Sequence, residues 1–134
     1  MEKGKLAATI LCIIGIVVSI YLTNYAFSKS PTVACPDIGP INCENVLNSQ
    51  YASILGMPNG VLGLLYFIFF IVLLYIVKNR NTTLLYNAVG IGFVIYYMNV
   101  ERIVGSICIW CTTVHVCVIL LFIISLGAVL KEKD

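Results

Sequence analysis

The chain has 134 residues, of which 60% are hydrophobic and 10% charged, and its formal net charge is +2. This composition excludes an ordinary soluble globular domain and indicates an integral membrane protein, for which we expect no nucleic-acid partner. Each crossing of a bilayer core about 30 Å thick takes roughly 20 residues. The length therefore predicts one membrane domain, residues 1–134, without room for a separate soluble catalytic domain.

Four apolar runs predict membrane helices, because backbone polar groups in lipid must be satisfied within each segment. In chain order the runs cover about 6–27, 61–77, 84–100 and 107–130. Only KNRNTT separates the second run from the third, and ERIVGS the third from the fourth, so we expect short antiparallel turns there. The first connection, 28–59, is long. We therefore expect an all-α integral membrane fold, a four-transmembrane-helix bundle.

The basic residues predict how this bundle is oriented. Six of the eight fall on one side of it: Lys3, Lys5, Lys78, Arg80, Lys131 and Lys133. The positive-inside rule then places both termini in the cytoplasm of a multi-pass cell-membrane protein, with the first loop extracytoplasmic. The sequence TVAC before Cys35 leaves a cleaved lipoprotein signal open, but the first run is long enough to span and we expect a signal anchor.

Two pairs of cysteines fall on the outward side, where disulfides are tolerated. Cys35 and Cys43 have seven residues between them, in a loop rich in proline and glycine that we expect to be mobile. Cys108 and Cys111 form a Cys-x-x-Cys at the start of the fourth helix, where i and i+3 share one face. The remaining two cysteines are expected to be small buried apolar residues: Cys12 and Cys117.

The two cysteines of the fourth helix are expected to differ in depth and in reactivity. Cys108 is expected in the first helical turn, where unpaired backbone N–H groups and the helix dipole favour a thiolate. Cys111 lies one turn deeper, about 4.5 Å further along the axis. This arrangement favours a relay from a water-facing dithiol, through a dithiol at the membrane boundary, to a lipid-soluble electron acceptor. Static disulfides and a zinc site built from the four cysteines are the alternatives, although the wide spacing of the loop pair is unusual for zinc.

The order of the two pairs resembles the vitamin K epoxide reductase family, whose prokaryotic members act as quinone reductases in disulfide formation. The resemblance extends over essentially the whole chain and includes GIVVSIY, CENVLNSQY, NGVLG and CIWCTT. Some relatives carry a fused thioredoxin-like domain. Because this chain ends at Asp134, the resemblance implies a separate, extracytoplasmic thioredoxin-like partner.

The resemblance also implies a role for each relay cysteine. Cys35 would be attacked by the thiolate of the reduced partner, which leaves Cys43 free to attack Cys108. Cys111 would contact the quinone, which serves as electron acceptor and could be menaquinone, ubiquinone or a relative. No resident metal is expected.

Two further residues are candidates for binding the quinone. His115 lies four residues after Cys111, on the same helix face, where it could bond a quinone oxygen or supply a proton; helix packing is the alternative. Asn59 precedes the second helix and is expected to be its N-cap. In the family the matching asparagine donates a hydrogen bond to the quinone carbonyl.

Ser49 and Tyr51 lie in CENVLNSQYASIL, where Val46, Leu47, Ile54 and Leu55 could form one face of a short interfacial helix. This helix would cover the quinone cavity, or the two polar residues would be ordinary interfacial ones. Four aromatic residues are expected to serve packing: Tyr66, Phe67, Tyr96 and Tyr97. Glu101 and Arg102 are expected to be a solvated pair at the membrane boundary.

The function expected is that of an enzyme, a membrane thiol–quinone oxidoreductase that reoxidises its thioredoxin-like partner and reduces a membrane quinone. The alternative is a small non-enzymatic membrane scaffold or subunit whose outward cysteines form static disulfides. The two differ in whether added quinone reoxidises the thiols.

Overall fold

Four long helices dominate the computed structural model, which describes residues 2–28, 39 and 41–133. The long elements are α1 (Glu2–Ser28), α3 (Asn59–Val72) continued by a π-helical turn η1 (Leu73–Val77), α4 (Arg80–Val104) and α5 (Ile109–Lys133). In the described part of the chain, four helices are long and apolar enough to cross a membrane. The four-helix membrane bundle predicted from the sequence is therefore confirmed.

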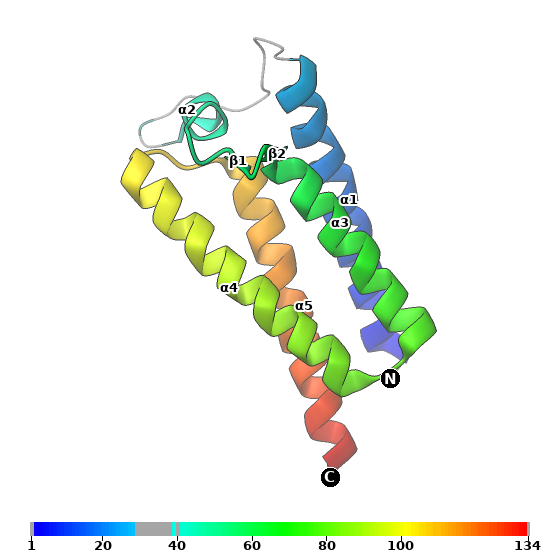
Figure 1. Ribbon diagram of the computed structural model, residues 1–134. Helices are drawn as coiled ribbons and strands as arrows, with labels where there is room; N and C mark the ends of the chain where they lie inside the picture. Colours follow the sequence, from blue (N-terminus) through cyan, green and yellow to red (C-terminus); the bar gives the residue numbers. More distant parts are fainter. Residues whose placement is uncertain (1, 29–38, 40, 134) are drawn as a thin grey trace.

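The helices differ in how closely they pack. α1 contacts both α3 and α5, and α5 also contacts α4, whereas α3 and α4 touch one another little. In Figure 1, α3 and α4 diverge from the turn that joins them toward the end of the bundle that carries α2 (Cys43–Leu47). Both ends of the chain lie at the opposite end of the bundle (Figure 1).

Small residues let α1 and α3 approach closely, as is common between membrane helices. A Cβ added to Gly15 of α1 would lie 2.4 Å from the ring of Phe67, which is fully buried. A Cβ added to Gly60 of α3 would lie 2.7 Å from the backbone nitrogen of Thr23. Glycine at both positions is therefore required by the close approach of the two helices.

A polar network joins α3, α4 and α5 inside the bundle. The hydroxyl of Tyr66 donates to Oδ1 of Asn87, which is fully buried. Nδ2 of Asn87 donates in turn to Oγ of Ser125 at 2.6 Å and to the carbonyl of Leu121 at 3.3 Å. In lipid such groups have no water to bond, so the network favours this one arrangement of the three helices.

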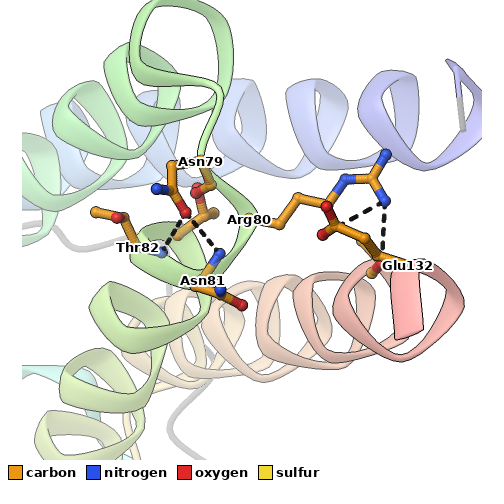
Figure 2. A network of polar contacts seen from close by, with 7 residues as sticks. Asn79, Arg80, Asn81, Thr82 and Glu132 are labelled. Atoms are coloured by element: carbon orange, nitrogen blue, oxygen red, sulfur yellow. Dashed lines mark hydrogen bonds and ion pairs between the residues drawn. The ribbon is translucent and has the colours of Figure 1, made fainter.

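The turn between the second and third membrane helices is shorter than expected. It consists of Lys78, which has a left-handed backbone (φ 56°), and Asn79. Oδ1 of Asn79 accepts hydrogen bonds from the backbone N–H groups of Asn81 (3.0 Å) and Thr82 (3.2 Å), so Asn79 caps α4 (Figure 2). The cap starts α4 at Arg80 rather than near residue 84.

Arg80 connects this turn to the last helix (Figure 2). Its Nη1 donates to the carbonyl of Ala128 at 3.3 Å and lies 3.9 Å from Oε2 of Glu132. Two other helix ends extend beyond the prediction into charged segments, since α1 begins at Glu2, four residues early, and α5 continues to Lys133, three residues late. Charged side chains at a helix end can reach water while the backbone stays helical.

Candidate redox site

The segment that carries Cys43 is held against the start of α5. The backbone N–H of Asn42 donates to the carbonyl of Ile107 at 3.0 Å, and Ile41 and Ile107 form a parallel β-bridge. Nδ2 of Asn45 donates to Oγ of Ser106 at 2.7 Å. The part of the first loop that begins at residue 41 is therefore docked on residues 106–107, where the sequence predicted a mobile loop.

This docking brings one cysteine of each pair into a single apolar cluster. Cys43 is 1% exposed and Cys108 is 0% exposed, and both pack with Val46 of α2. Val104, Trp110 and other partly buried side chains close the cluster from the α4 and α5 side. The two sulfurs are thus shielded from water by the contact between the loop and the helix start.

The oxidation states of the cysteines differ. Cys43 is disulfide-bonded, whereas four cysteines are free thiols: Cys12, Cys108, Cys111 and Cys117. Cys12 and Cys117 are buried in the apolar core, as expected from the sequence. Cys35, the predicted entry point of the relay, lies outside the described residues.

Cys108 lies just outside α5 and not in its first turn, because the helix begins at Ile109. Its sulfur nevertheless accepts a hydrogen bond from the backbone N–H of Cys111, at 3.3 Å, as a capping side chain does. The hydrogen bond from the Cys111 side chain, helped by the backbone N–H groups of Cys111 and Trp110, lowers the pKa of the Cys108 thiol against the opposing effects of burial and of Glu101. The expected thiolate preference therefore holds, with the side chain of Cys111 as its first cause.

Cys111 faces a cavity of about 920 Å³ between α3 and α4. The cavity is lined mainly by apolar side chains, with a small number of polar ones, as is usual for a site that binds an apolar ligand. The lining includes every noncysteine residue that the sequence singled out as quinone-binding: Ser49, Tyr51, Asn59 and His115. Cys108 is not in the lining, so within the helix pair only Cys111 reaches this space.

Asn59 is not the N-cap of its helix, so that prediction is wrong. Pro58 occupies the cap position without a side-chain hydrogen bond, and Asn59 is the first residue of α3. Its amide is used differently: Nδ2 donates to the carbonyl of Tyr51 at 2.9 Å, and Oδ1 accepts from the hydroxyl of Tyr97 at 2.8 Å. These bonds fix which end of the amide is the donor and leave one of its two N–H groups for a ligand.

Tyr97 is a site residue that the sequence reading assigned to packing. It lines the cavity, bonds Asn59 and stacks on the ring of His115, with ring centroids 6.2 Å apart and planes at 12°. His115 is 8% exposed. Asn59, Tyr97 and His115, from α3, α4 and α5, thus form one wall of the cavity. The sequence carried no signal that separated Tyr97 from its neighbour Tyr96, which is 44% exposed.

The interfacial helix is shorter than predicted. α2 ends at Leu47, and a two-stranded antiparallel hairpin follows, formed by β1 (Ser53–Ile54) and β2 (Met57–Pro58). Leu55 and Gly56, at the tip of the hairpin, both have positive φ, as tight hairpin turns require. Leu55 is 99% exposed, so it does not share a helix face with Val46.

Ser49 and Tyr51 lie between α2 and the hairpin and help to close the cavity at this end of the bundle. Oγ of Ser49 donates to the carbonyl of Val46 at 2.7 Å, which holds the turn after α2. Tyr51 contributes its carbonyl to Asn59, as described above. The predicted cover over the cavity is therefore built from turns and a hairpin after a single helical turn.

Two polar atoms in the cavity wall have no bonding partner. Within residues 2–28, 39 and 41–133, the buried side-chain oxygens without a hydrogen bond are Oγ of Ser19 and Oε1 of Glu101, and both residues line the cavity. Glu101 is therefore not the solvated boundary residue predicted from the sequence. Unsatisfied buried oxygens are rare and call for an explanation, and a ligand in the cavity would supply one.

A membrane helical bundle with a Cys-x-x-Cys at the mouth of an apolar cavity, and a loop cysteine packed against it, defines a class of membrane proteins built for thiol–disulfide chemistry. The vitamin K epoxide reductase family model matches residues 6–126. The chain belongs to this family. It is accordingly a multi-pass membrane protein, and membership supports an oxidoreductase that acts on thiols and disulfides, in a family that uses quinones.

Proposed function

We propose that the protein is a membrane thiol–quinone oxidoreductase in which electrons pass from Cys35 and Cys43 to Cys108 and Cys111 and then to a quinone. Cys43, once reduced, attacks Cys108 of the oxidised helix pair, and a disulfide between them is the intermediate. Cys35 then resolves this intermediate, which leaves Cys108 and Cys111 reduced. Each step is an exchange through a mixed disulfide and needs no other reagent.

The observation that carries this proposal is the packing of Cys43 against Cys108 in one cluster, with Cys111 facing the adjacent cavity. A static scaffold would have no need for a free Cys-x-x-Cys beside a disulfide-bonded cysteine. The packing directs Cys43 to the Cys108 sulfur, and this attack expels Cys111. The lowered pKa of Cys108 favours the second step, in which Cys35 attacks the Cys43 sulfur of the intermediate and Cys108 is the leaving group.

The cavity supports a quinone as the acceptor. Its volume of about 920 Å³ falls within the range of pockets for small molecules, and its wall is apolar, as a lipid-soluble ring requires. Asn59, held by Tyr51 and Tyr97, has one N–H for a quinone carbonyl. His115, which lines the same cavity, would bond the second oxygen or deliver a proton to it. Menaquinone and ubiquinone are both candidates.

The reductant in this proposal is a separate thioredoxin-like protein on the extracytoplasmic side, which the protein returns to its disulfide form. The sidedness rests on the distribution of basic residues, which favours cytoplasmic termini. Because the described ends of the chain and the redox site lie at opposite ends of the bundle (Figure 1), cytoplasmic termini would leave Cys43 and Cys108 at the outer surface.

The test is a coupled assay of the purified protein with a reduced thioredoxin-like protein and a short-chain quinone, followed by quinone absorbance. The wild type should consume quinone only when the reduced partner is present. Cys111→Ser should abolish the reaction, whereas Cys117→Ser, in the same helix, should leave it unchanged. Quinone consumption that does not depend on the partner, or that survives Cys111→Ser, would overturn the proposal.

A further inference from the structure

Glu101 has a position that neither its place in the sequence nor the proposed relay accounts for. It lies in the last turn of α4, and its carbonyl accepts the backbone N–H groups of Gly105 and Ser106, which fixes the backbone before the turn into α5. Its side chain lines the cavity, together with Cys111 and His115. Oε1 is buried and has no hydrogen-bond partner among the described residues.

The carboxylate lies close to the helix thiol pair. It interacts with the backbone N–H of Cys108 and acts electrostatically on the sulfurs of both Cys108 and Cys111. Besides Cys111 and Glu101, the titratable side chains among the described lining residues are His115 and five tyrosines, of which Tyr97 stacks on His115. Among these groups, only Glu101 is a carboxylate, and burial of its Oε1 without a hydrogen bond is costly unless that oxygen binds a proton or a ligand.

We propose that Glu101 is the proton acceptor for the Cys111 thiol when the helix pair is oxidised by the quinone. This step deepens the proposed function and rests on it. No residue of the relay otherwise removes the thiol proton from Cys111, which faces an apolar cavity and not water. A carboxylate beside the sulfur provides general base catalysis where bulk water is absent.

In the reduced pair, Cys108 is a thiolate and Cys111 a thiol. When the Cys108–Cys111 bond forms, the S–H bond of Cys111 breaks, its proton goes to Glu101, and two electrons go to the quinone. The quinone takes up two protons to become the hydroquinone, one from Glu101 and one from solvent through His115.

The alternative is that Glu101 acts on the thiols only through its charge, and it predicts the opposite effect of Glu101→Gln on the rate of oxidation by quinone. The negative carboxylate raises the pKa of Cys108, so its removal should lower that pKa and make the Cys108 thiolate easier to form. An electrostatic role therefore predicts that Glu101→Gln reacts as fast as the wild type or faster. A proton acceptor predicts that the same variant reacts more slowly.

The test measures two rates in protein reduced with dithiothreitol and freed of it. The first is reoxidation of the helix pair by a short-chain quinone, and the second is exchange of the same pair with an added disulfide. Glu101→Gln should slow the quinone step by about 100-fold, the usual loss of a general base, and leave the KM for quinone and the disulfide exchange unchanged. Glu101→Asp should recover part of the rate. Glu132→Gln, which removes a carboxylate at the far end of the bundle, should match the wild type.

The outcomes separate the two proposals. A wild type that fails to reduce quinone contradicts the proposed function itself. An active wild type with a Glu101→Gln variant of equal or greater rate overturns only the role of Glu101. If Glu101→Gln does not fold, Glu101→Asp decides the matter, because the longer reach to Cys111 must slow the quinone step and spare the disulfide exchange; equal rates in both assays would contradict the proposal.

Discussion

The hydroxyl of Tyr97 donates a 2.8 Å hydrogen bond to Oδ1 of Asn59, and the same amide donates through Nδ2 to the carbonyl of Tyr51. The bond joins α4 to the first residue of α3 at the cavity wall. It also fixes the amide with its N–H groups on the side of Tyr51. Tyr97 therefore positions an amide that can offer an N–H to a quinone oxygen.

Tyr97→Phe should weaken quinone binding without stopping thiol exchange. Loss of one such hydrogen bond is worth about 1 kcal/mol, so the KM for quinone should rise about fivefold in steady-state assays. Tyr96→Phe is the matched control, since Tyr96 is adjacent, is partly exposed and does not line the cavity. Equal effects of the two substitutions would show that the bond to Asn59 does not position the amide.

The packing of Cys43 against Cys108 predicts a trapped intermediate. In the double variant Cys35→Ser, Cys111→Ser, neither resolving thiol remains, so mild oxidation should join Cys43 to Cys108. Peptide mapping without reductant should find this cross-link in most molecules. The same treatment of Cys35→Ser, Cys108→Ser should give no comparable link to Cys111; a link to Cys111 of equal yield would mean that the order of the relay is wrong.

The lowered pKa of Cys108 predicts how its thiolate depends on pH. As pH falls, the thiolate should persist below the range of an ordinary cysteine thiol, and its contribution to stability should be lost only as pH passes through the lowered pKa. Cys111→Ala removes the hydrogen bond that is the largest cause and should move the titration back upward. The ultraviolet absorbance of the thiolate, taken as the difference from Cys108→Ser, measures this; an unchanged midpoint in Cys111→Ala would contradict the assignment.

The close approach of α1 to α3 predicts that Gly15 does not tolerate a larger side chain. Gly15→Ala places a Cβ 2.4 Å from the buried ring of Phe67, and the forced movement should cost about 1–3 kcal/mol of unfolding free energy. Gly92→Ala, in α4, is the control, because nothing lies within 4 Å of its added Cβ. Thermal unfolding in detergent compares the two, and equal midpoints would be inconsistent with the close contact.

The cap at the far end of the bundle should affect stability alone. Asn79→Ala removes the side-chain acceptor for the N–H groups of Asn81 and Thr82 and should cost about 1 kcal/mol. Asn81→Ala, whose backbone alone is used in the cap, should cost less. Both variants should retain the thiol and quinone rates of the wild type; a lost rate would reveal coupling between the two ends of the bundle.

Composition was enough to predict the four membrane helices, because a span must be apolar over its whole length whatever its neighbours are. The helix ends were less predictable. Asn79 caps α4 directly after the left-handed Lys78, and Asn59 was assigned a cap position that Pro58 occupies. Several polar residues near each helix start could have been the N-cap, and the local backbone conformation decides which residue takes that position.

The site was predictable where the spacing along one helix determines the geometry, as for Cys111 and His115, which face one cavity. It was not predictable where two helices must meet. Tyr97 has the same sequence surroundings as Tyr96, and only the packing of α4 beside α3 and α5 turns it toward Asn59. Glu101 carries a charge at a helix end, which usually means contact with water, but the turn into α5 places it beside Cys108. The roles of Cys35 and Cys43 in the relay stay predictions.

The most direct test of the relay to a quinone is the number of quinone molecules that one fully reduced protein molecule reduces without any partner protein. The purified protein is fully reduced, freed of reductant and mixed with excess short-chain quinone, and the loss of quinone absorbance is counted per protein. Four relay thiols form two disulfides, so the wild type should reduce two quinone molecules, Cys43→Ser one, and Cys111→Ser none. Reduction of two quinones by Cys111→Ser, or of none by the wild type, would contradict the relay to a quinone.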